Sequence, residues 1–361
     1  MDAARPIHVD GAAGSGSGTI VRFATAFAAL LGRTLHVTNA RVRRPKRGLR
    51  AQHVAAVRAC AELCSGEVEG VEVGALEFLF KPGERIRGGR YDWDIGSAGS
   101  ATMLALGILP VACFADDRVV ARIRGGVFQD FAPSPFHMQH VLAPLLARTG
   151  AAVEIEVLRA GYVPQGAGTI ELRVEPARRR LAPLVLGEAG TVRSVEGIAF
   201  ASRLAERAVA ERMARACEER LEHAGLHARI ERIEDVLAAR PGASLAVWAE
   251  TSFGCRLGAD RAGAPGRRSE DIGRFVAEQL LSDLASQAST DRHVADQLVP
   301  FAAVATGTSR YLVPAPTDHL TTNLWLAAQF GARATIDGSR VEIEGLGAVR
   351  EDGRRIALSA G

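Results

Sequence analysis

The sequence has 361 residues, 47% hydrophobic and only 5% aromatic, with 44 basic and 41 acidic side chains and a formal net charge of +3. This length predicts two or more hydrophobic cores. No apolar run approaches the roughly 20 residues of a membrane-spanning helix, and the N-terminal residues lead directly into an expected strand, which argues against a secretory leader.

The five cysteines lack the paired CxxC spacing of a zinc site. Cys60 and Cys64 lie one helical turn apart and could bind a metal, but buried reduced thiols are the better interpretation. We therefore expect a protein of the reducing cytoplasm.

The first structured segment, HVDGAAGSGSGTIVRFATAFAALLG at 8–32, predicts a strand, a glycine-rich turn and an apolar helix. It lacks the lysine of a Walker A loop and the G-x-G-x-x-G spacing and acidic residue of a dinucleotide fingerprint. Backbone N–H groups at a helix start attract anions. A tight turn without a ligand is equally compatible with this segment.

The next segment, 39–53, carries a dense run of positive charge. Pro45 and Gly48 predict a loop, and a helix is expected from Leu49 onward. Such a cluster without acids indicates contact with a polyanion, although a solvated surface turn is the alternative. No aromatic platform accompanies it, so base stacking is not indicated. The cations are Arg41, Arg43, Arg44, Lys46, Arg47 and Arg50.

An internal repeat organises the rest of the chain. The segment at 92–102 (DWDIGSAGSAT) resembles 8–18, and Gln-His-Val recurs at 52–54 and 139–141. Each copy predicts strand, glycine turn, helix, strand, helix and two strands, with period-2 alternation marking the sheet. A third copy follows from 293, where His319 falls at the position of His53 and His140. Repeats of this size are small α/β subdomains.

The extra residues before the third copy predict an inserted domain at about 184–280. It should contain a strand, a long amphipathic helix, a strand, a hairpin within 244–260 and a last helix from Ser269. We therefore expect a large domain of residues 1–183 and 281–361, built from repeats at about 5–90, 91–183 and 285–361.

Six motifs, taken together, resemble the RNA 3'-terminal phosphate cyclase family over essentially the whole chain. The resemblance implies an α/β fold of three repeats, similar to the C-terminal domain of translation initiation factor three, with a smaller inserted α/β domain. The motifs, in the family's order, are DGAAGSGSGTIVR, RRPKRGLRAQH, IGSAGSAT, GYVPQGAG, ADQLVP and DHLTTN.

The resemblance also implies a reaction. An RNA 3'-phosphate would be converted to a 2',3'-cyclic phosphate at the expense of ATP, through a covalent histidine–AMP and an RNA adenylate. His319, in DHLTTN, matches the family's nucleophile, and Asp318 beside it could orient the imidazole. Mg²⁺ or another divalent metal would screen the phosphates.

The same resemblance implies two groups of binding residues. The ATP pocket would include Arg22 and Leu106 together with His293, Val294, Ala295, Asp296 and Gln297. Arg41, Arg44 and Gln52 match positions near the nucleotide phosphates or the RNA end. The expected partner is RNA with a 3'-phosphate, with no membrane and no obligate protein partner.

The sequence departs from the family pattern at four positions. Ser15 stands where a metal-binding glutamate is usual, Thr19 and Leu106 replace glutamines, and His293 replaces a tyrosine, so the metal ligands are left unassigned. A cyclase-like RNA-binding protein without catalysis is therefore an alternative, although the retained His319 favours an enzyme. An enolpyruvyl-transfer enzyme would give the nucleotidylation motifs no role.

Overall fold

The computed structural model describes residues 5–350 and 356–358, and shows a mixed α/β protein. Within residues 5–350 the strands form four four-stranded sheets. A fifth, two-stranded sheet pairs β17 (Ala348–Arg350) with β18 (Ile356–Leu358). No helix in the described ranges is long and apolar enough to cross a membrane.

The first unit contains the opening segment. Its strands form a sheet in the order β1-β2-β4-β3, with β1 parallel to β2 and the other pairs antiparallel. Helix α1 is apolar on all sides, which explains why it is almost wholly buried against α2, α3 and α10. The elements are β1 (Ile7–Asp10), α1 (Gly18–Leu31), β2 (Leu35–Thr38), α2 (Ala51–Cys64), β3 (Glu67–Glu69) and β4 (Phe78–Lys81).

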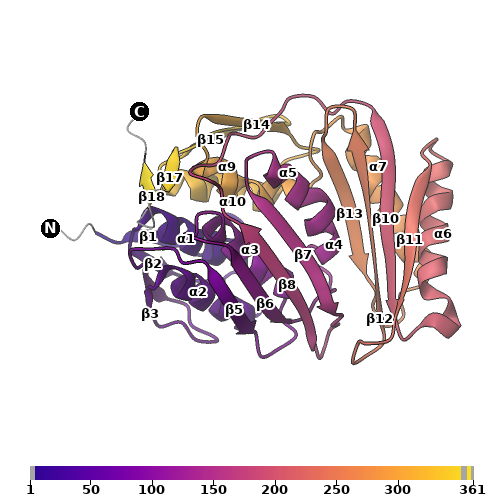
Figure 1. The fold of residues 1–361 in the computed structure, drawn as a ribbon, viewed down its shortest axis with the longest axis horizontal. Coiled ribbons are helices and arrows are strands. Elements are labelled where there is room, and N and C mark those ends of the chain that lie inside the picture. The colour runs from indigo at the N-terminus through magenta and orange to yellow at the C-terminus, as the bar shows by residue number, and fades with distance from the viewer. Residues whose placement is uncertain (1–4, 351–355, 359–361) are drawn as a thin grey trace.

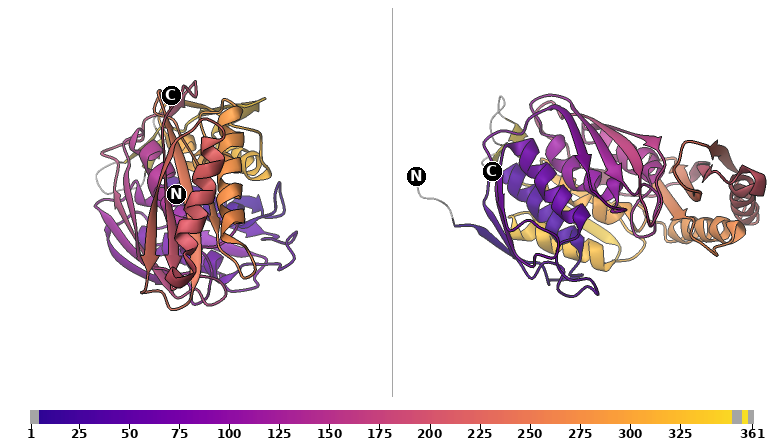
Figure 2. Two further views of the ribbon diagram at one scale, coloured as in Figure 1. Left: turned by 90° about the vertical axis from the view of Figure 1, so that its right-hand side faces the viewer. Right: turned by 90° about the horizontal axis from the view of Figure 1, so that it is seen from below.

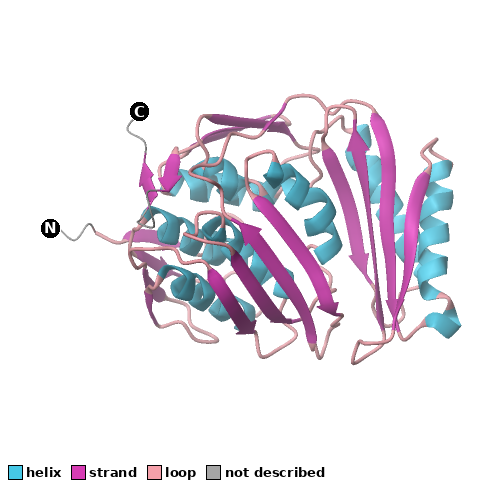
Figure 3. Ribbon diagram, viewed as in Figure 1, coloured by secondary structure: helices cyan, strands magenta, loops and turns pink. Residues whose placement is uncertain are grey.

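The second unit forms a sheet in the order β5-β6-β8-β7, which lies in front of the helices in Figures 1 and 3. Its second helical segment consists of α4, the π-turn η1 and α5 in succession, and His140 lies in the π-turn. The elements are β5 (Gly89–Asp94), α3 (Ala101–Ala112), β6 (Val119–Gly125), α4 (Pro135–His137), η1 (Met138–Leu142), α5 (Ala143–Ala147), β7 (Ala152–Arg159) and β8 (Gly168–Glu175).

The third unit forms a sheet in the order β15-β16-β14-β9. Val185 and Leu186, which sequence analysis places in the insert, pair in parallel with Arg310 and Tyr311 and so belong to this sheet. The elements are β9 (Val185–Leu186), α8 (Val294–Gln297), α9 (Val299–Val304), β14 (Thr308–Leu312), α10 (Asp318–Gln329), β15 (Arg333–Asp337) and β16 (Arg340–Glu344).

The segment between β9 and α8, which we call the inserted body, lies at one end of the molecule (Figure 2). Its sheet has the order β11-β10-β12-β13, and α6 and α7 pack against each other and against these strands. The expected strand–helix–strand, hairpin and helix from Ser269 are confirmed. The elements are β10 (Val192–Ser202), η2 (Ala205–Arg207), α6 (Val209–Glu222), β11 (Ala228–Asp235), β12 (Gly242–Thr251), β13 (Arg256–Ala262) and α7 (Ser269–Ala285).

Polar and aromatic contacts join this body to the second unit. The His140 ring stacks on Trp248, with ring centroids 4.0 Å apart and planes 3° from parallel. Arg256 donates to the carbonyl of His140 at 3.1 Å, and the hydroxyls of Tyr162 and Ser202 lie 2.7 Å apart. Because β12 and β13 are docked in this way, they can form one wall of a cavity.

Candidate active site

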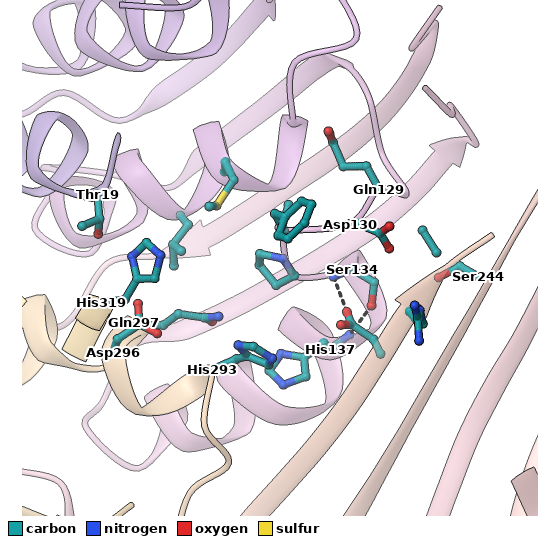
Figure 4. A pocket seen from close by; sticks show the side chains of 18 of the residues that line it. Thr19, Gln129, Asp130, Ser134, His137, Ser244, His293, Asp296, Gln297 and His319 are labelled. Carbon is teal, nitrogen blue, oxygen red and sulfur yellow. Dashed lines mark hydrogen bonds between the residues drawn. The ribbon is translucent and has the colours of Figure 1, made fainter. Parts of the chain in front are cut away.

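A cavity of about 510 Å³ lies where the three units meet the inserted body (Figure 4). The first unit contributes side chains from α1, the second from α3 and the loop before α4, and the third from α8 and α10. The inserted body contributes β12, β13, the loop after β13 and α7. The lining residues are Thr19, Arg22, Phe23, Met103, Leu106, Gln129, Asp130, Phe131, Ala132, Pro133, Ser134, His137, Ser244, Asp260, Arg261, Ala262, Arg267, Phe275, His293, Asp296, Gln297 and His319.

His319 is the second residue of α10, and its ring is exposed in the cavity. The side chain of Thr317 caps this helix by accepting a hydrogen bond from Leu320 N at 3.1 Å. Nδ1 of His319 lies 3.4 Å from Ser17 Oγ, at the start of α1. Desolvation by the surrounding protein, together with the charges of Arg22 and Arg44, lowers the pKa of His319 below its usual 6.5. The imidazole is therefore mainly neutral at pH 7, the form in which it is a nucleophile.

The glycine-rich loop before α1 is held by its neighbours. Ser15 N donates to Thr322 Oγ1 at 2.8 Å, and Arg43 Nη1 donates to the carbonyl of Gly14 at 2.6 Å. The backbone N–H groups of Gly11, Ala12, Ala13, Ser15 and Gly16 all have partners within the protein. A phosphate at this loop would consequently be bound at the N-terminus of α1, whose partial positive charge points toward the cavity beside His319.

Arg22 and Asp296 are ionisable residues that line the cavity together with His319. Both are surrounded by protein, and burial lowers the pKa of Arg22 to about 10 while the charge of Asp296 opposes this shift. Burial raises the pKa of Asp296 to about 7, again partly offset by its partner. Asn323 Nδ2 donates to the carbonyl of Asp296 at 3.0 Å.

The structure does not bring the expected phosphate or RNA contacts of the basic segment (39–53) into the cavity: Arg41, Arg44 and Gln52 are not among its lining residues. Arg41 Nη1 donates to the carbonyls of Lys46 at 3.0 Å and Gly48 at 2.7 Å, which stabilises the loop itself. Gln52 Oε1 accepts from Ser100 N at 2.8 Å and so connects α2 to the start of α3. The charge of Arg44 contributes to the lowered pKa of His319.

The residues expected in the ATP pocket divide into two sets. Arg22, Leu106, His293, Asp296 and Gln297 line the cavity with His319. Val294 and Ala295 are instead buried in the hydrophobic core, at 0% and 1% exposure. Their side chains therefore pack in the core, while Val294 N donates to Asp291 Oδ1 and the carbonyl of Ala295 accepts from the Tyr311 hydroxyl.

Sequence analysis missed the far wall of the cavity. Arg267 binds Asp130 through two hydrogen bonds of 3.0 and 2.8 Å, and Ser134 N donates to Asp260 Oδ2 at 2.5 Å. Arg261 lies 3.8 Å from the centroid of the Phe275 ring, a cation–π contact. The loop after β6 carries few polar residues, and no motif marks Asp130, Ser134 or the four residues of the inserted body.

His137 is a second histidine of the cavity that the motifs did not indicate. Its Nε2 lies 3.0 Å from Asp291 Oδ2, and both side chains are buried. Asp291 precedes α8 and also accepts hydrogen bonds from His293 N and Val294 N. This pair fixes α4 against the start of α8.

The described residues do not provide a preformed metal site. Within that part of the chain, no three His, Cys, Asp or Glu side chains lie together so that they could hold a metal ion. Ser15 Oγ donates to Ser17 Oγ at 3.0 Å, so the position where a glutamate is usual in the family is occupied by a hydroxyl close to His319.

Comparisons with known proteins place most of the chain in one family. The family model for RNA 3'-terminal phosphate cyclase matches residues 13–336. The RNA 3'-terminal phosphate cyclase of Methanopyrus kandleri is 40% identical over 330 residues, covering 90% of this chain and 93% of its own. Those of Hyperthermus butylicus and Pyrococcus furiosus are 41% and 38% identical, covering 84% and 90% of this chain and 85% and 93% of their own.

Among solved structures, an EPSP synthase from Acinetobacter baumannii aligns with 98% of this chain and 68% of its own at 11% identity, but its TM-score of 0.25 is too low to support any conclusion. The family match and the curated relatives cover most of the sequence. The chain therefore belongs to the RNA 3'-terminal phosphate cyclase family.

Proposed function

We propose that this protein is an ATP-dependent RNA 3'-phosphate cyclase that uses His319 as its nucleophile. The observation that carries the proposal is the position of His319: its ring lines the cavity, and its Nδ1 lies 3.4 Å from Ser17 Oγ at the N-terminus of α1. Desolvation and the charges of Arg22 and Arg44, which lower its pKa, act in the same sense. Membership of the family supports this reaction class, in which ATP is a substrate.

The reaction would proceed in three displacements. His319 Nε2, the ring nitrogen opposite the one near Ser17 Oγ, attacks the α-phosphorus of ATP, so that an N–P bond forms and the bond to pyrophosphate breaks. An oxygen of the RNA 3'-phosphate then attacks the same phosphorus and releases the histidine. Finally, the 2'-hydroxyl attacks the RNA 3'-phosphorus, loses its proton to solvent and expels AMP.

The positive charges around the cavity suit a reaction between negatively charged phosphate groups. The N-terminus of α1 and the buried guanidinium of Arg22 are placed to stabilise charge on the phosphates of ATP. Arg44 and the rest of the basic segment would attract the RNA end to the neighbouring surface. The apolar side chains of Phe23, Met103 and Leu106 leave the adjacent part of the cavity suited to a nucleoside.

The residues present do not fit a protein cage for a divalent metal, so we assign no step to one. A magnesium ion supplied with ATP would be bound largely by phosphate oxygens and water, as is usual for that ion. The cytoplasmic location expected from the sequence stays a prediction.

We also infer a domain division that differs slightly from the expected one. The three sheets of the large body share one strand order when their strands are ranked along the chain, first-second-fourth-third, which supports three copies of one unit. The pairing of β9 with β14 and the packing of α7 on β13 support an insert that begins after Leu186 and ends near Ala285.

The decisive experiment is incubation with α-³²P-labelled ATP and magnesium, followed by a denaturing gel. The wild-type protein should retain label, and His319→Ala should retain none, while His227→Ala, an exposed histidine of the inserted body, should label normally. Label on another histidine, located by mass spectrometry, would remove His319 from the mechanism. A wild-type protein that binds RNA but never labels would favour the alternative, a non-catalytic cyclase-like RNA-binding protein.

A further inference from the structure

Phe131, in the loop after β6, is an aromatic residue that is fully exposed to solvent at the cavity. It is 100% exposed and is also one of the lining residues, so its ring stands at the rim. A single exposed aromatic residue is ordinary on a protein surface. The backbone of Phe131, however, has φ of 65°, a left-handed conformation that is rare for a bulky residue. Such outliers gather where ligands bind.

The loop that carries Phe131 is held by the inserted body on both sides of this residue. Before it, Asp130 accepts two hydrogen bonds from Arg267, at 3.0 and 2.8 Å. After it, Ser134 N donates to Asp260 Oδ2 at 2.5 Å. The backbone of Phe131 is therefore fixed at the rim and is not part of a loose loop tip. A side chain presented in this way loses little conformational entropy when a ligand packs on it.

The same wall of the cavity carries a cation without an ion-pair partner. Arg261 lines the cavity, and its guanidinium carbon lies 3.8 Å from the centroid of the Phe275 ring. Among the described residues Arg261 forms no ion pair, whereas Arg267 on the same wall is neutralised by Asp130. Single-stranded nucleic acid is bound by this combination of groups, because its bases stack on exposed aromatic rings while its phosphates pair with cations.

The position of this wall favours RNA over ATP as the ligand. In Figure 4, Asp130 and Ser134 lie across the cavity from His319. In the proposed reaction the α-phosphate of ATP lies at His319 and its nucleoside against the apolar side chains of the cavity. The RNA arrives once the adenylate has formed and enters from solvent, so its last nucleotide crosses the rim where Phe131 stands. The basic segment contains no Phe, Tyr or Trp and does not supply such a ring.

We propose that the ring of Phe131 stacks on the 3'-terminal base of the RNA and so directs its 3'-phosphate toward the adenylate on His319. This inference rests on the proposed function, because it requires RNA as the second substrate. It also gives the inserted body a role, since Arg267 and Asp260 position the loop that carries Phe131. Stacking on a ring does not read the hydrogen-bonding edges of a base, so the contact accepts any terminal base.

The first test uses the wild-type protein and needs no variant. Fluorescence anisotropy measures equilibrium binding of two 5'-labelled oligoribonucleotides with a 3'-phosphate, which differ only in that one ends in an abasic ribose. The abasic RNA should bind about 5- to 150-fold more weakly, the range expected for one base stacked on an aromatic side chain. Equal binding of the two RNAs would overturn the proposal.

The second test asks whether Phe131 causes that difference. Phe131→Ala should bind both RNAs equally weakly, whereas Phe131→Trp, which keeps a flat ring, should retain the preference for the RNA with a terminal base. Phe253→Ala is the matched control, because Phe253 is an exposed phenylalanine of the inserted body, 58% exposed, that does not line the cavity. The full preference should persist in this control. An unchanged preference in Phe131→Ala would refute the assignment.

The outcome is separable from that of the proposed function. A wild-type protein that forms the adenylate but binds both RNAs equally would retain its function and lose the role of Phe131. A protein that prefers the terminal base through Phe131 but never forms the adenylate would retain the RNA contact and lose the cyclase mechanism. If Phe131→Ala weakened ATP binding and left RNA binding unchanged, the ring would contact the base of ATP, and the proposal would be wrong.

Discussion

The starts of α2 and α10 carry histidines at matching places in the sequence motifs, but the two rings have opposite surroundings. His53 is 3% exposed, and its Nδ1 accepts a hydrogen bond from Arg50 N at 3.0 Å. It lies so close to Gly18 that a Cβ there would be 2.1 Å from His53 Nε2. His319 is exposed in the cavity, with Ser17 as its one side-chain neighbour within hydrogen-bonding distance among the described residues.

This difference shows how similar local sequences acquire different roles. Both histidines have a lowered pKa, chiefly because of desolvation, and Arg22 contributes to both shifts. Neutrality alone therefore does not mark a nucleophile. The two histidines differ in accessibility: His53 fills the space beneath the opening loop, whereas a substrate can reach the ring of His319.

The largest expected effect separates these two histidines directly. His319→Ala should abolish covalent labelling by ATP with little loss of stability, because its ring is exposed. His53→Ala should lower the free energy of unfolding by about 2–4 kcal/mol, since a buried ring and a hydrogen bond at the start of α2 are lost, while the folded fraction still labels. Denaturant unfolding and the labelling gel measure the two outcomes. Complete loss of label in a folded His53→Ala protein would mean that His53 is also needed for adenylate formation and is not purely structural.

The next effect concerns the cations beside each histidine. Arg44→Gln should weaken use of RNA 3'-phosphate and reduce the slope of log binding constant against log salt by about 0.7, the value for one contact with single-stranded nucleic acid. Arg41→Gln should do the same and also destabilise the loop, because it removes two hydrogen bonds to backbone carbonyls. Salt titrations of RNA binding measure the slope. If the Arg41→Gln/Arg44→Gln double variant kept the wild-type slope, these two arginines would not contact the RNA phosphates, and the basic segment would be an ordinary solvated surface.

A smaller effect is expected from pH. Adenylate formation needs neutral His319, whose pKa is lowered, so the rate should be constant above about pH 6.5 and fall as pH decreases through that lowered pKa. Arg44→Gln removes a charge that lowers this pKa, so its acid limb should move to higher pH. Single-turnover rates between about pH 5 and pH 8 test the shift. If the acid limb of the Arg44→Gln variant moved to lower pH, a group other than His319 would control the rate.

The smallest effect is expected at Ser15, two hydroxyl contacts away from the His319 ring. Ser15→Glu adds the carboxylate usual in the family, so half-maximal adenylate formation should need less magnesium. Ser15→Gln, of the same length but uncharged, is the matched control. If both variants give the wild-type magnesium titration curve, position 15 lies outside the metal site.

Much of the local structure follows from the sequence alone. The apolar run and the glycines of 8–32 predict β1, the turn and α1, and the pattern of about 184–280 predicts the strands and helices of the inserted body. These predictions succeed because periodicity, capping and turn formation act within a few residues. The motif DHLTTN likewise singled out His319, which the structure places in the first turn of α10 and in the lining of the cavity.

The tertiary structure alone decided which of these residues meet. His137 and Asp291 are 154 positions apart and Asp130 and Arg267 are 137 apart, and each pair forms only because the inserted body and α8 dock against the second unit. Val185–Leu186 joins the third sheet by the same kind of long-range pairing. No local pattern encodes such contacts, because their free energy comes from the packing of whole units. The proposed nucleophile was therefore indicated by the sequence, and the pocket that surrounds it was not.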